Sequence, residues 1–497
     1  MTSVVSGESI VPADDFQLPE TISRDYLLHH RVCPINTANG YVQLLAAPDA
    51  YLEAADELAE LFELPVQVET VSLDTVHRAI ERLTSQRQHA ASDARWDADD
   101  DFATDVRDLA NQPPVIRYVN LLFRDAHDAS ASDIHLEATR DGLIVRFRLD
   151  GVLVPAAAPP PELQHAVVSR VKLLADLDIA ERRRPQDGRI RIRLDARELD
   201  LRVSTAPTIF GESVVLRLLD RGGRPVRLVD LGMPDELLCG VIDLATRAHG
   251  MMLVTGPTGS GKTTTLYAAL QQRKTGDEKI ITVEDPVEYH LPGVTQVPVH
   301  RQAGVTFASA LRSILRQDPD VVMIGEMRDP ETSEIAIQAA MTGHLVFSTL
   351  HTNDAIGALP RLLDLGIPDY LISATLDGVL AQRLVRTVCE DCREPYVPDA
   401  AQVALLADGD SSTMPSEFTH GRGCSACRGT GYRGRVGIFE LLCLDDALRD
   451  AINRRASRAE FRVLAEQAGM RGLRHDGWAK VRAGVTTVDE VLRVTER

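Results

Sequence analysis

Residues 254–264 read Val254-Thr255-Gly256-Pro257-Thr258-Gly259-Ser260-Gly261-Lys262-Thr263-Thr264, with the spacing G-x-x-x-x-G-K-[ST]. An apolar run precedes this stretch at residues 251–254, and a helix-forming run follows it at residues 265–270. A strand, a glycine-rich loop and a helix in this order are the context in which the spacing indicates a phosphate-binding loop. Average amino-acid usage gives roughly 0.02 chance matches in a chain of this length, so a plain glycine-rich turn explains the stretch poorly. We therefore predict a nucleoside triphosphate site.

The same residues predict how the triphosphate is held. Glycines let backbone N–H groups turn inward around phosphate oxygens, and the helix N-terminus adds the positive end of its dipole. Lys262 can reach the β- and γ-phosphates, and the Thr263 hydroxyl can ligate Mg²⁺. The residues predicted to bind the nucleotide are Gly256, Pro257, Thr258, Gly259, Ser260, Gly261, Lys262, Thr263 and Thr264.

The composition limits the possible partners. The chain has 497 residues and a formal net charge of −19, which argues against coating nucleic acid or anionic lipid through its overall field. No run approaches the roughly 18 apolar residues of a membrane span, and the N-terminus lacks the pattern of a signal peptide. We expect a cytoplasmic protein without a nucleic-acid partner, whose membrane association is indirect.

The chain is long enough for about three or four domains. The first 86 residues predict a hairpin over 32–45, with Asn39-Gly40 as its turn, and helices over 22–30, 54–62 and 73–83. The predicted divisions are a mobile N-terminus (1–17), a small α/β module (18–86), an acidic linker (87–112), an αβ domain with a mostly antiparallel sheet (113–222) and an α/β domain around the phosphate loop (228–497). Within the last, residues 385–440 hold a cysteine cluster and residues 444–497 predict a helical tail.

Three further apolar runs predict parallel strands, each followed by a polar side chain. The runs and these side chains are 280–283 before Glu288, 321–324 before Glu326, and 345–349 before His351. Glu326 could support Mg²⁺ through water, Glu288 could orient or deprotonate an attacking water, and His351 could contact the γ-phosphate. A solvated loop explains the acidic cluster around Glu288 equally well, and a lone histidine is usually structural. Parallel sheets place ligands at the carboxyl ends of their strands, so we expect these side chains to converge.

Several arginines could neutralise charge that develops on phosphate, from the same subunit or from a neighbour. Surface ion pairing is the usual role of an arbitrary arginine and stays the alternative for each. The candidates are Arg202, Arg217, Arg312, Arg316 and Arg328.

Four of the seven cysteines form two C-x₂-C pairs, Cys389 with Cys392 and Cys424 with Cys427. The 31 residues between the pairs exceed the usual zinc-ribbon spacing of about 15–20. Two such pairs on facing turns predict a tetrahedral S₄ site for structural zinc. A redox pair is the alternative, but redox C-x-x-C motifs normally open a helix in a thioredoxin-like unit. We expect the remaining three, Cys33, Cys239 and Cys443, to be plain core residues.

Four segments resemble the nucleotide motifs of the secretion and pilus traffic ATPases, called the Walker A, Asp box, Walker B and His box. They are residues 256–264, 282–289, 316–329 and 342–353. Residues 131–137 and 184–189 resemble the preceding domain of that family. The cysteine pairs are similar to those of its assembly branch, the type II secretion and type IV pilus extension ATPases. The length and the tail look closest to the type II secretion members.

The resemblance implies a RecA-like P-loop domain preceded by a PAS-like αβ domain, with a zinc-binding insertion and a small N-terminal module. It also implies a hexameric ATP hydrolase with ATP between the two domains. Lys262 would hold phosphates, Thr263 and Glu326 would serve Mg²⁺, Glu288 would orient water, and His351 would lie near the γ-phosphate. The five candidate arginines and Arg435 correspond by position to arginines tied to catalysis or subunit coupling.

The N-terminal module would dock on an inner-membrane secretion protein at the cytoplasmic face. The motor would then drive pseudopilus growth and protein export across the outer membrane. A type IV pilus extension motor is the nearest alternative. A nucleic-acid translocase and a nucleotide-binding scaffold without turnover are alternatives of other classes.

Overall fold

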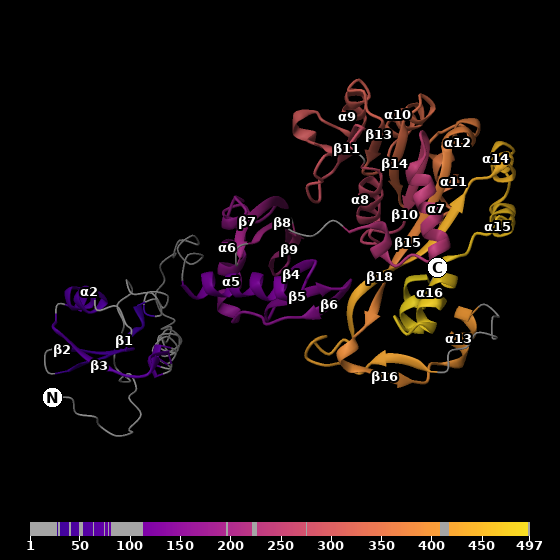
Figure 1. Cartoon of the computed structure of the whole chain (residues 1–497). Helices are drawn as coiled ribbons and strands as arrows, with labels where there is room; N and C mark the ends of the chain where they lie inside the picture. Colours follow the sequence, from indigo (N-terminus) through magenta and orange to yellow (C-terminus); the bar gives the residue numbers. More distant parts are fainter. Residues whose placement is uncertain are drawn as a thin grey trace. The chain divides into compact units, whose positions relative to one another are not determined.

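The computed structural model (Figure 1) divides into two compact units, Met1–Ala103 and Thr104–Arg497. The structure describes residues 27, 30–38, 41–48, 53–62, 64–73, 75–77, 79–80, 113–194, 197–220, 226–274, 276–407 and 417–495. The predicted mobile N-terminus, the Asn39-Gly40 turn and the acidic linker lie outside these residues, as do most residues of the predicted helix over 22–30. Of the predicted helix over 73–83, residues 73, 75–77 and 79–80 are described, and all of these are helical.

The first unit contains a three-stranded sheet and a helix. Its elements are β1 (Val32–Ala38), β2 (Tyr41–Ala46), α2 (Glu53–Phe62) and β3 (Val66–Thr70). The predicted hairpin is confirmed, because β1 and β2 pair antiparallel. β3 pairs parallel to β2 and was not predicted; it is short and most of its side chains are exposed, so it lacks an apolar pattern. Cys33 is fully buried, as expected.

The predicted antiparallel sheet is also confirmed, with six strands in the order β6-β5-β4-β9-β8-β7. The elements here are α5 (Pro113–Asp128), β4 (Asp133–Thr139), β5 (Gly142–Leu149), β6 (Val152–Pro155), η1 (Pro161–Leu163), α6 (Gln164–Leu174), β7 (Gln186–Leu194), β8 (Arg197–Thr208) and β9 (Gly211–Asp220). α5 buries a stripe that runs from Val115 to Ala126, and it shares one core with α6 and with alternate residues of the strands. Alternation places one face of the sheet against the two helices.

The phosphate loop lies in a seven-stranded sheet of order β12-β11-β13-β14-β10-β15-β18. Its elements up to β15 are η2 (Leu228–Leu231), α7 (Asp235–Thr246), β10 (Gly250–Thr255), α8 (Lys262–Arg273), β11 (Ile280–Glu284), β12 (Thr295–Pro298), η3 (Arg301–Ala303), α9 (Phe307–Ile314), β13 (Val321–Ile324), α10 (Pro330–Met341), β14 (Leu345–Leu350), α11 (Ala358–Asp364), α12 (Asp369–Thr375) and β15 (Leu376–Val388). The first six strands in this order, β12-β11-β13-β14-β10-β15, are parallel to their neighbours, as predicted.

Helices cover both faces of this sheet (Figure 1). One core joins it to α7 and α8, and the other joins it to α9, α10, α11 and α12. β10, β11, β13 and β14 are buried along their whole length, which explains their continuous apolar runs. This arrangement gathers the ends of the strands beside the phosphate loop.

β15 runs on beyond the sheet into the cysteine-containing segment, and β18 returns antiparallel to it. The remaining elements are η4 (Glu390–Cys392), β16 (Arg393–Tyr396), α13 (Ala400–Ala407), β17 (Phe418–Gly421), β18 (Tyr432–Cys443), α14 (Asp446–Asn453), α15 (Arg458–Gln467), α16 (Leu473–Arg482) and α17 (Val488–Thr495). The predicted helical tail is confirmed by α14 to α17. The expectation for Cys239 and Cys443 is wrong, because both are exposed. Cys239 lies on the outer side of α7, and Cys443 ends the edge strand β18.

Candidate functional site

The phosphate loop connects β10 to α8 and depends on glycine at two of its turns. Gly256 has φ of 151°, and a Cβ there would lie 2.5 Å from the Gln382 carbonyl oxygen. Gly261 has φ of 87° and is the N-cap of α8, without a side-chain capping bond. The first N–H groups of α8 are therefore available to an anion. Pro257, Thr258 and Gly259 form the exposed tip of the loop.

Lys262 begins α8 and is buried, with only 9% of its surface exposed. Its Nζ donates to the carbonyl oxygens of Gly256 at 2.8 Å and Pro257 at 3.0 Å. Burial lowers the pKa of Lys262 to about 8, although the Glu326 carboxylate acts in the opposite direction. Thr263 and Thr264 follow in the same helical turn and are half-buried.

Two predicted residues from neighbouring strands lie together beside Lys262. Glu326 follows β13, and its Oε2 forms an ion pair with Arg328 Nε at 2.6 Å. His351 follows β14, with its Nε2 3.6 Å from the same Glu326 oxygen. Burial lowers the pKa of His351, and the Lys262 charge lowers it further. The structure thus brings Lys262, Glu326, His351 and Arg328 into one group of charges.

Glu288 follows β11 and faces a different set of charges. Burial raises its pKa, while Arg202 and Arg217 oppose that rise. Both arginines belong to the antiparallel sheet, where they are paired across β8 and β9. Arg217 Nε also contacts Asp133 Oδ1 at 2.9 Å. Glu288 is therefore coupled to the preceding αβ sheet more than to Lys262.

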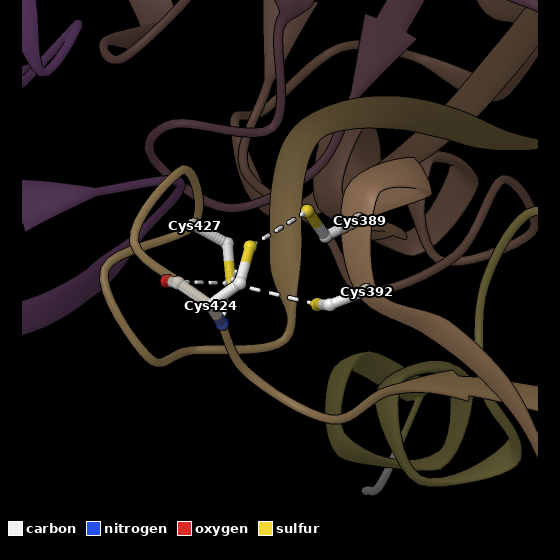
Figure 2. Close-up of side chains that lie close together, drawn as sticks. All are labelled: Cys389, Cys392, Cys424 and Cys427. Atoms are coloured by element: carbon white, nitrogen blue, oxygen red, sulfur yellow. Dashed lines mark hydrogen bonds between the residues drawn. The ribbon is translucent and has the colours of Figure 1, made fainter.

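The four cysteines of the two C-x₂-C pairs point toward one another from two turns (Figure 2). Their sulfur atoms all lie within 4.8 Å of one another, and three pairs are 3.7, 3.8 and 3.9 Å apart. A regular tetrahedron with Zn–S bonds of about 2.3 Å has sulfur atoms about 3.8 Å apart. The donor set and its spacing therefore fit zinc.

Backbone N–H groups around the cluster stabilise negative charge on sulfur. Cys427 Sγ accepts from the N–H groups of Cys424 at 3.1 Å and Gly431 at 3.3 Å. Burial raises the pKa of this thiol, but the two N–H donors prevail and lower it to about 6. Gly423 also donates to Cys392 Sγ at 3.3 Å, but there burial prevails and raises the pKa of the thiol to about 12. The Cys427 sulfur is therefore stabilised as a thiolate, the form of cysteine that binds metal.

Comparison with known proteins assigns this arrangement to a family. The family model described as "Type II/IV secretion system protein" matches residues 108–493. The chain belongs to the type II/IV secretion system protein family.

The similar proteins include type II secretion proteins and a pilus assembly ATPase. "Type II secretion system protein E" of Xanthomonas campestris pv. campestris is 47% identical over 96% of this chain and 86% of its own length. "Type II secretion system ATPase E" of Vibrio cholerae is 47% identical over 84% of both chains. "Type IV pilus assembly ATPase PilB" of Myxococcus xanthus is 41% identical over 99% of this chain and 90% of its own.

Solved structures agree with the fold assignment. The pilus retraction motor PilT with bound ADP aligns with a TM-score of 0.51 and 26% identity, over 76% of this chain and 96% of its own. The Legionella pneumophila ATPase DotB aligns with a TM-score of 0.55 at 20% identity, over 76% of this chain and 95% of its own, which bears on the fold alone. The relatives and the shared fold identify the chain as a member of a secretion ATPase family, which supports ATP hydrolysis.

Three arginines predicted for this secretion ATPase family member lie away from Lys262. Arg312 donates to Glu331 Oε1 at 2.6 Å, and Arg316 donates to the carbonyl oxygen of Arg312 at 2.8 Å. Arg435 Nε lies 3.2 Å from Asp150 Oδ1. Among the interactions of the described residues, none joins these three to the phosphate loop of the same chain.

Sequence reasoning missed Gln382 and Arg383, two buried residues of β15 that lie against the phosphate loop. A signal was present, because they interrupt the otherwise apolar run Val379–Val385. A further missed contact joins Thr255 to Thr352, whose hydroxyl oxygens are 2.7 Å apart.

Among the described residues no helix has the length and apolarity to cross a bilayer.

Proposed function

We propose that this chain is an ATP hydrolase that powers protein export by type II secretion. The observation that carries the proposal is the convergence of Lys262, Glu326 and His351 at the carboxyl ends of three neighbouring parallel strands. A lysine, a carboxylate and a histidine beside a glycine-rich loop are suited to holding and cleaving a triphosphate. The 47% identity to type II secretion proteins supports the secretion role.

The residues of the site have distinct tasks in this proposal. The loop N–H groups and Lys262 bind the phosphates, and His351 lies near the γ-phosphate. Thr263 and Glu326 would hold Mg²⁺, which supplies charge neutralisation at the β- and γ-phosphates when bound. Glu288 orients the attacking water and accepts its proton. Its raised pKa, which burial causes, makes it a better proton acceptor than an ordinary exposed glutamate.

In this proposal, the candidate arginines couple ATP hydrolysis to movement of one part of the protein against another. Arg202 and Arg217 act on Glu288 from the preceding αβ sheet, so a change of charge at Glu288 alters the attraction between the two regions. Arg312 and Arg316 are exposed on and after α9, where a neighbouring subunit can reach them. We propose that they act across subunits in a homo-hexamer, whereas Arg328 acts on Glu326 and Arg435 on Asp150 within the same chain.

The tetracysteine cluster is proposed to hold a structural zinc ion. Cys389, Cys392, Cys424 and Cys427 supply four ligands, so no position is open for a substrate. The metal would fix the turns that precede β16 and follow β17 to each other.

The proposed setting is the cytoplasmic face of the inner membrane. The sheet module formed by β1, β2 and β3 would dock on an inner-membrane secretion protein, and the acidic segment over 87–112 would act as a tether. The motor would then drive pseudopilus assembly. A type IV pilus extension motor is the second candidate, because the match to PilB spans 99% of this chain, but its identity of 41% is lower.

The experiment is a Lys262→Ala substitution in the full-length chain. We expect it to abolish hydrolysis of radiolabelled ATP and to leave secreted enzymes in the periplasm of a complemented secretion mutant. Normal secretion by this variant would refute the motor function. Restoration of pilus extension in place of secretion by the wild-type chain would favour the second candidate.

A further inference from the structure

Two buried polar residues of strand β15 pack against the phosphate loop. Gln382 is 2% exposed and Arg383 is 8% exposed. The Gln382 amide Nε2 donates to the Ser260 carbonyl oxygen at 2.6 Å, and its Oε1 accepts from the Thr265 hydroxyl at 2.7 Å. Because a carbonyl oxygen can only accept, the amide nitrogen must face Ser260. Gln382 therefore fastens the loop to the first turns of α8.

Arg383 lies beside the start of the same loop. A Cβ on Gly256 would be only 3.2 Å from its Nη1, so the guanidinium lies against the first glycine of the loop. Its Nη2 donates to the Asn353 carbonyl oxygen at 2.8 Å, and Nη1 donates to the Gln382 carbonyl oxygen at 3.4 Å. Asn353 belongs to the segment that carries His351. Arg383 thus connects the loop to that segment.

The partners of this guanidinium are carbonyl oxygens. In the part of the chain that the structure describes, no carboxylate oxygen lies within the 4.0 Å of an ion pair with Arg383. Asp354 and Glu440 act on it electrostatically from beyond that distance. A buried charge without a paired opposite charge is costly, and arginine stays protonated even when buried. Lys262, the second cation here, is close enough to be disfavoured by Arg383.

Two buried cations beside a phosphate loop are an arrangement that a polyanion stabilises. We infer that Arg383 is a nucleotide-site cation that strengthens binding of the triphosphate in cis, and that Gln382 is the positioning residue that holds the loop for it. This inference rests on the proposed ATP site. Because the field of Arg383 acts on the total phosphate charge, it favours ATP over ADP.

The test compares full-length variants by titration with fluorescent ATP and ADP analogues and by thermal melting with and without nucleotide. Arg383→Gln removes the charge, Arg383→Lys keeps it, and Arg482→Gln is the matched control, an exposed arginine of α16. For Arg383→Gln we expect ATP affinity to fall by about tenfold or more, because the free energy of a hydrogen bond to a charged group corresponds to at least that change in affinity. In the same variant, ADP affinity should fall less than ATP affinity, and the melting temperature without nucleotide should not fall. Arg383→Lys and Arg482→Gln stay within about threefold of the wild type.

A purely structural arginine gives the opposite result. Arg383→Gln would then melt earlier without nucleotide and would bind ATP with wild-type affinity, and that outcome overturns the inference. If Arg383→Gln does not fold, Gln382→Met decides, because it breaks both amide bonds without changing charge. Unchanged ATP affinity in folded Gln382→Met overturns the positioning role, and a loss of about tenfold supports it.

Failure of this inference differs from failure of the proposed function. If the wild type and Lys262→Ala both fail to bind ATP, the proposed ATP site itself is wrong. If the wild type binds ATP, Lys262→Ala does not, and Arg383→Gln binds as the wild type does, only the role of Arg383 is lost.

Discussion

The affinity of this protein for ATP should fall steeply as the pH rises through about 8. Lys262 is the buried cation that we place on the β- and γ-phosphates, and burial lowers its pKa from 10.5 to about 8 in the nucleotide-free chain. This difference corresponds to about 3 kcal/mol of disfavoured charge. The negative phosphates favour the protonated amine, so ATP binds to the protonated form.

The magnitude follows from the fraction of protonated lysine. With a pKa of about 8, that fraction is about three quarters at pH 7.5 and about 3% at pH 9.5. Phosphate groups are fully ionised across this range, because their second pKa is about 6. The apparent Kd for ATP should therefore rise by about 25-fold between these pH values. A lysine with its ordinary pKa of 10.5 would change the Kd by less than about 1.2-fold.

The same pKa affects folding with a definite sign. Between pH 8 and 10.5 the unfolded chain binds the Lys262 proton and the nucleotide-free folded chain does not. Stability of the nucleotide-free protein therefore rises with pH over this interval as far as this lysine is concerned. ATP-dependent stabilisation should fall over the same interval.

The assay is equilibrium titration with a fluorescent ATP analogue at several pH values and constant ionic strength. Lys262→Arg is the matched control, because arginine keeps its charge throughout. Any residual binding by this variant should be nearly independent of pH. A wild-type Kd that stays within about twofold from pH 7.5 to 9.5 would refute the reasoning that links burial of Lys262 to phosphate binding.

Three further outcomes are expected. Replacing Cys389 and Cys392 by Ser should abolish binding of one zinc ion per chain, as measured by metal analysis of the purified protein; absence of zinc from the wild type would contradict the S₄ site. Glu326→Gln should retain ATP binding but lose roughly 10²- to 10⁴-fold in hydrolysis rate, measured by phosphate release, and unaltered turnover would remove Glu326 from the mechanism. Burial raises the pKa of Glu490, but bonds from Arg493 and Arg386 prevail and lower it to about 2. Its contribution of about 3 kcal/mol to the free energy of unfolding is present above pH 4.5 and is lost as the pH falls toward 2. Glu490→Gln should therefore lower the melting temperature at pH 7, and acidification should lower it further by less than in the wild type. If acidification lowered the melting temperatures of the variant and the wild type equally, the lowered pKa of Glu490 would be contradicted.

The elements of the phosphate-loop domain were predictable from the sequence because their signals are local. β10, β11, β13 and β14 are buried on both faces, so each appears as a continuous apolar run. The segment of β9 was not predicted, although its residues 214–219 form an apolar run that only Arg217 interrupts. β3 was missed because most of its side chains are exposed.

The candidate site was predictable only in part. The sequence predicted that Glu288, Glu326 and His351 follow strand ends, but a position after a strand does not say which charge a side chain faces. In the structure Glu326 and His351 act with Lys262, whereas Glu288 acts with Arg202. That division depends on packing of the antiparallel sheet, which is distant in sequence.

By itself the sequence determined the features that a short segment carries: the glycine loop, whose backbone conformation needs glycine at fixed spacing, and the cysteine pairs, whose ligands are separated by two residues. Only the tertiary structure decided that β15 lies beside β10, which brings Gln382 and Arg383 to a loop more than a hundred residues earlier. The physical reason is the range of the interactions. Backbone conformation and ligand spacing are set by neighbours along the chain, whereas burial, electrostatic coupling and hydrogen bonds between strands depend on which segments pack together in space.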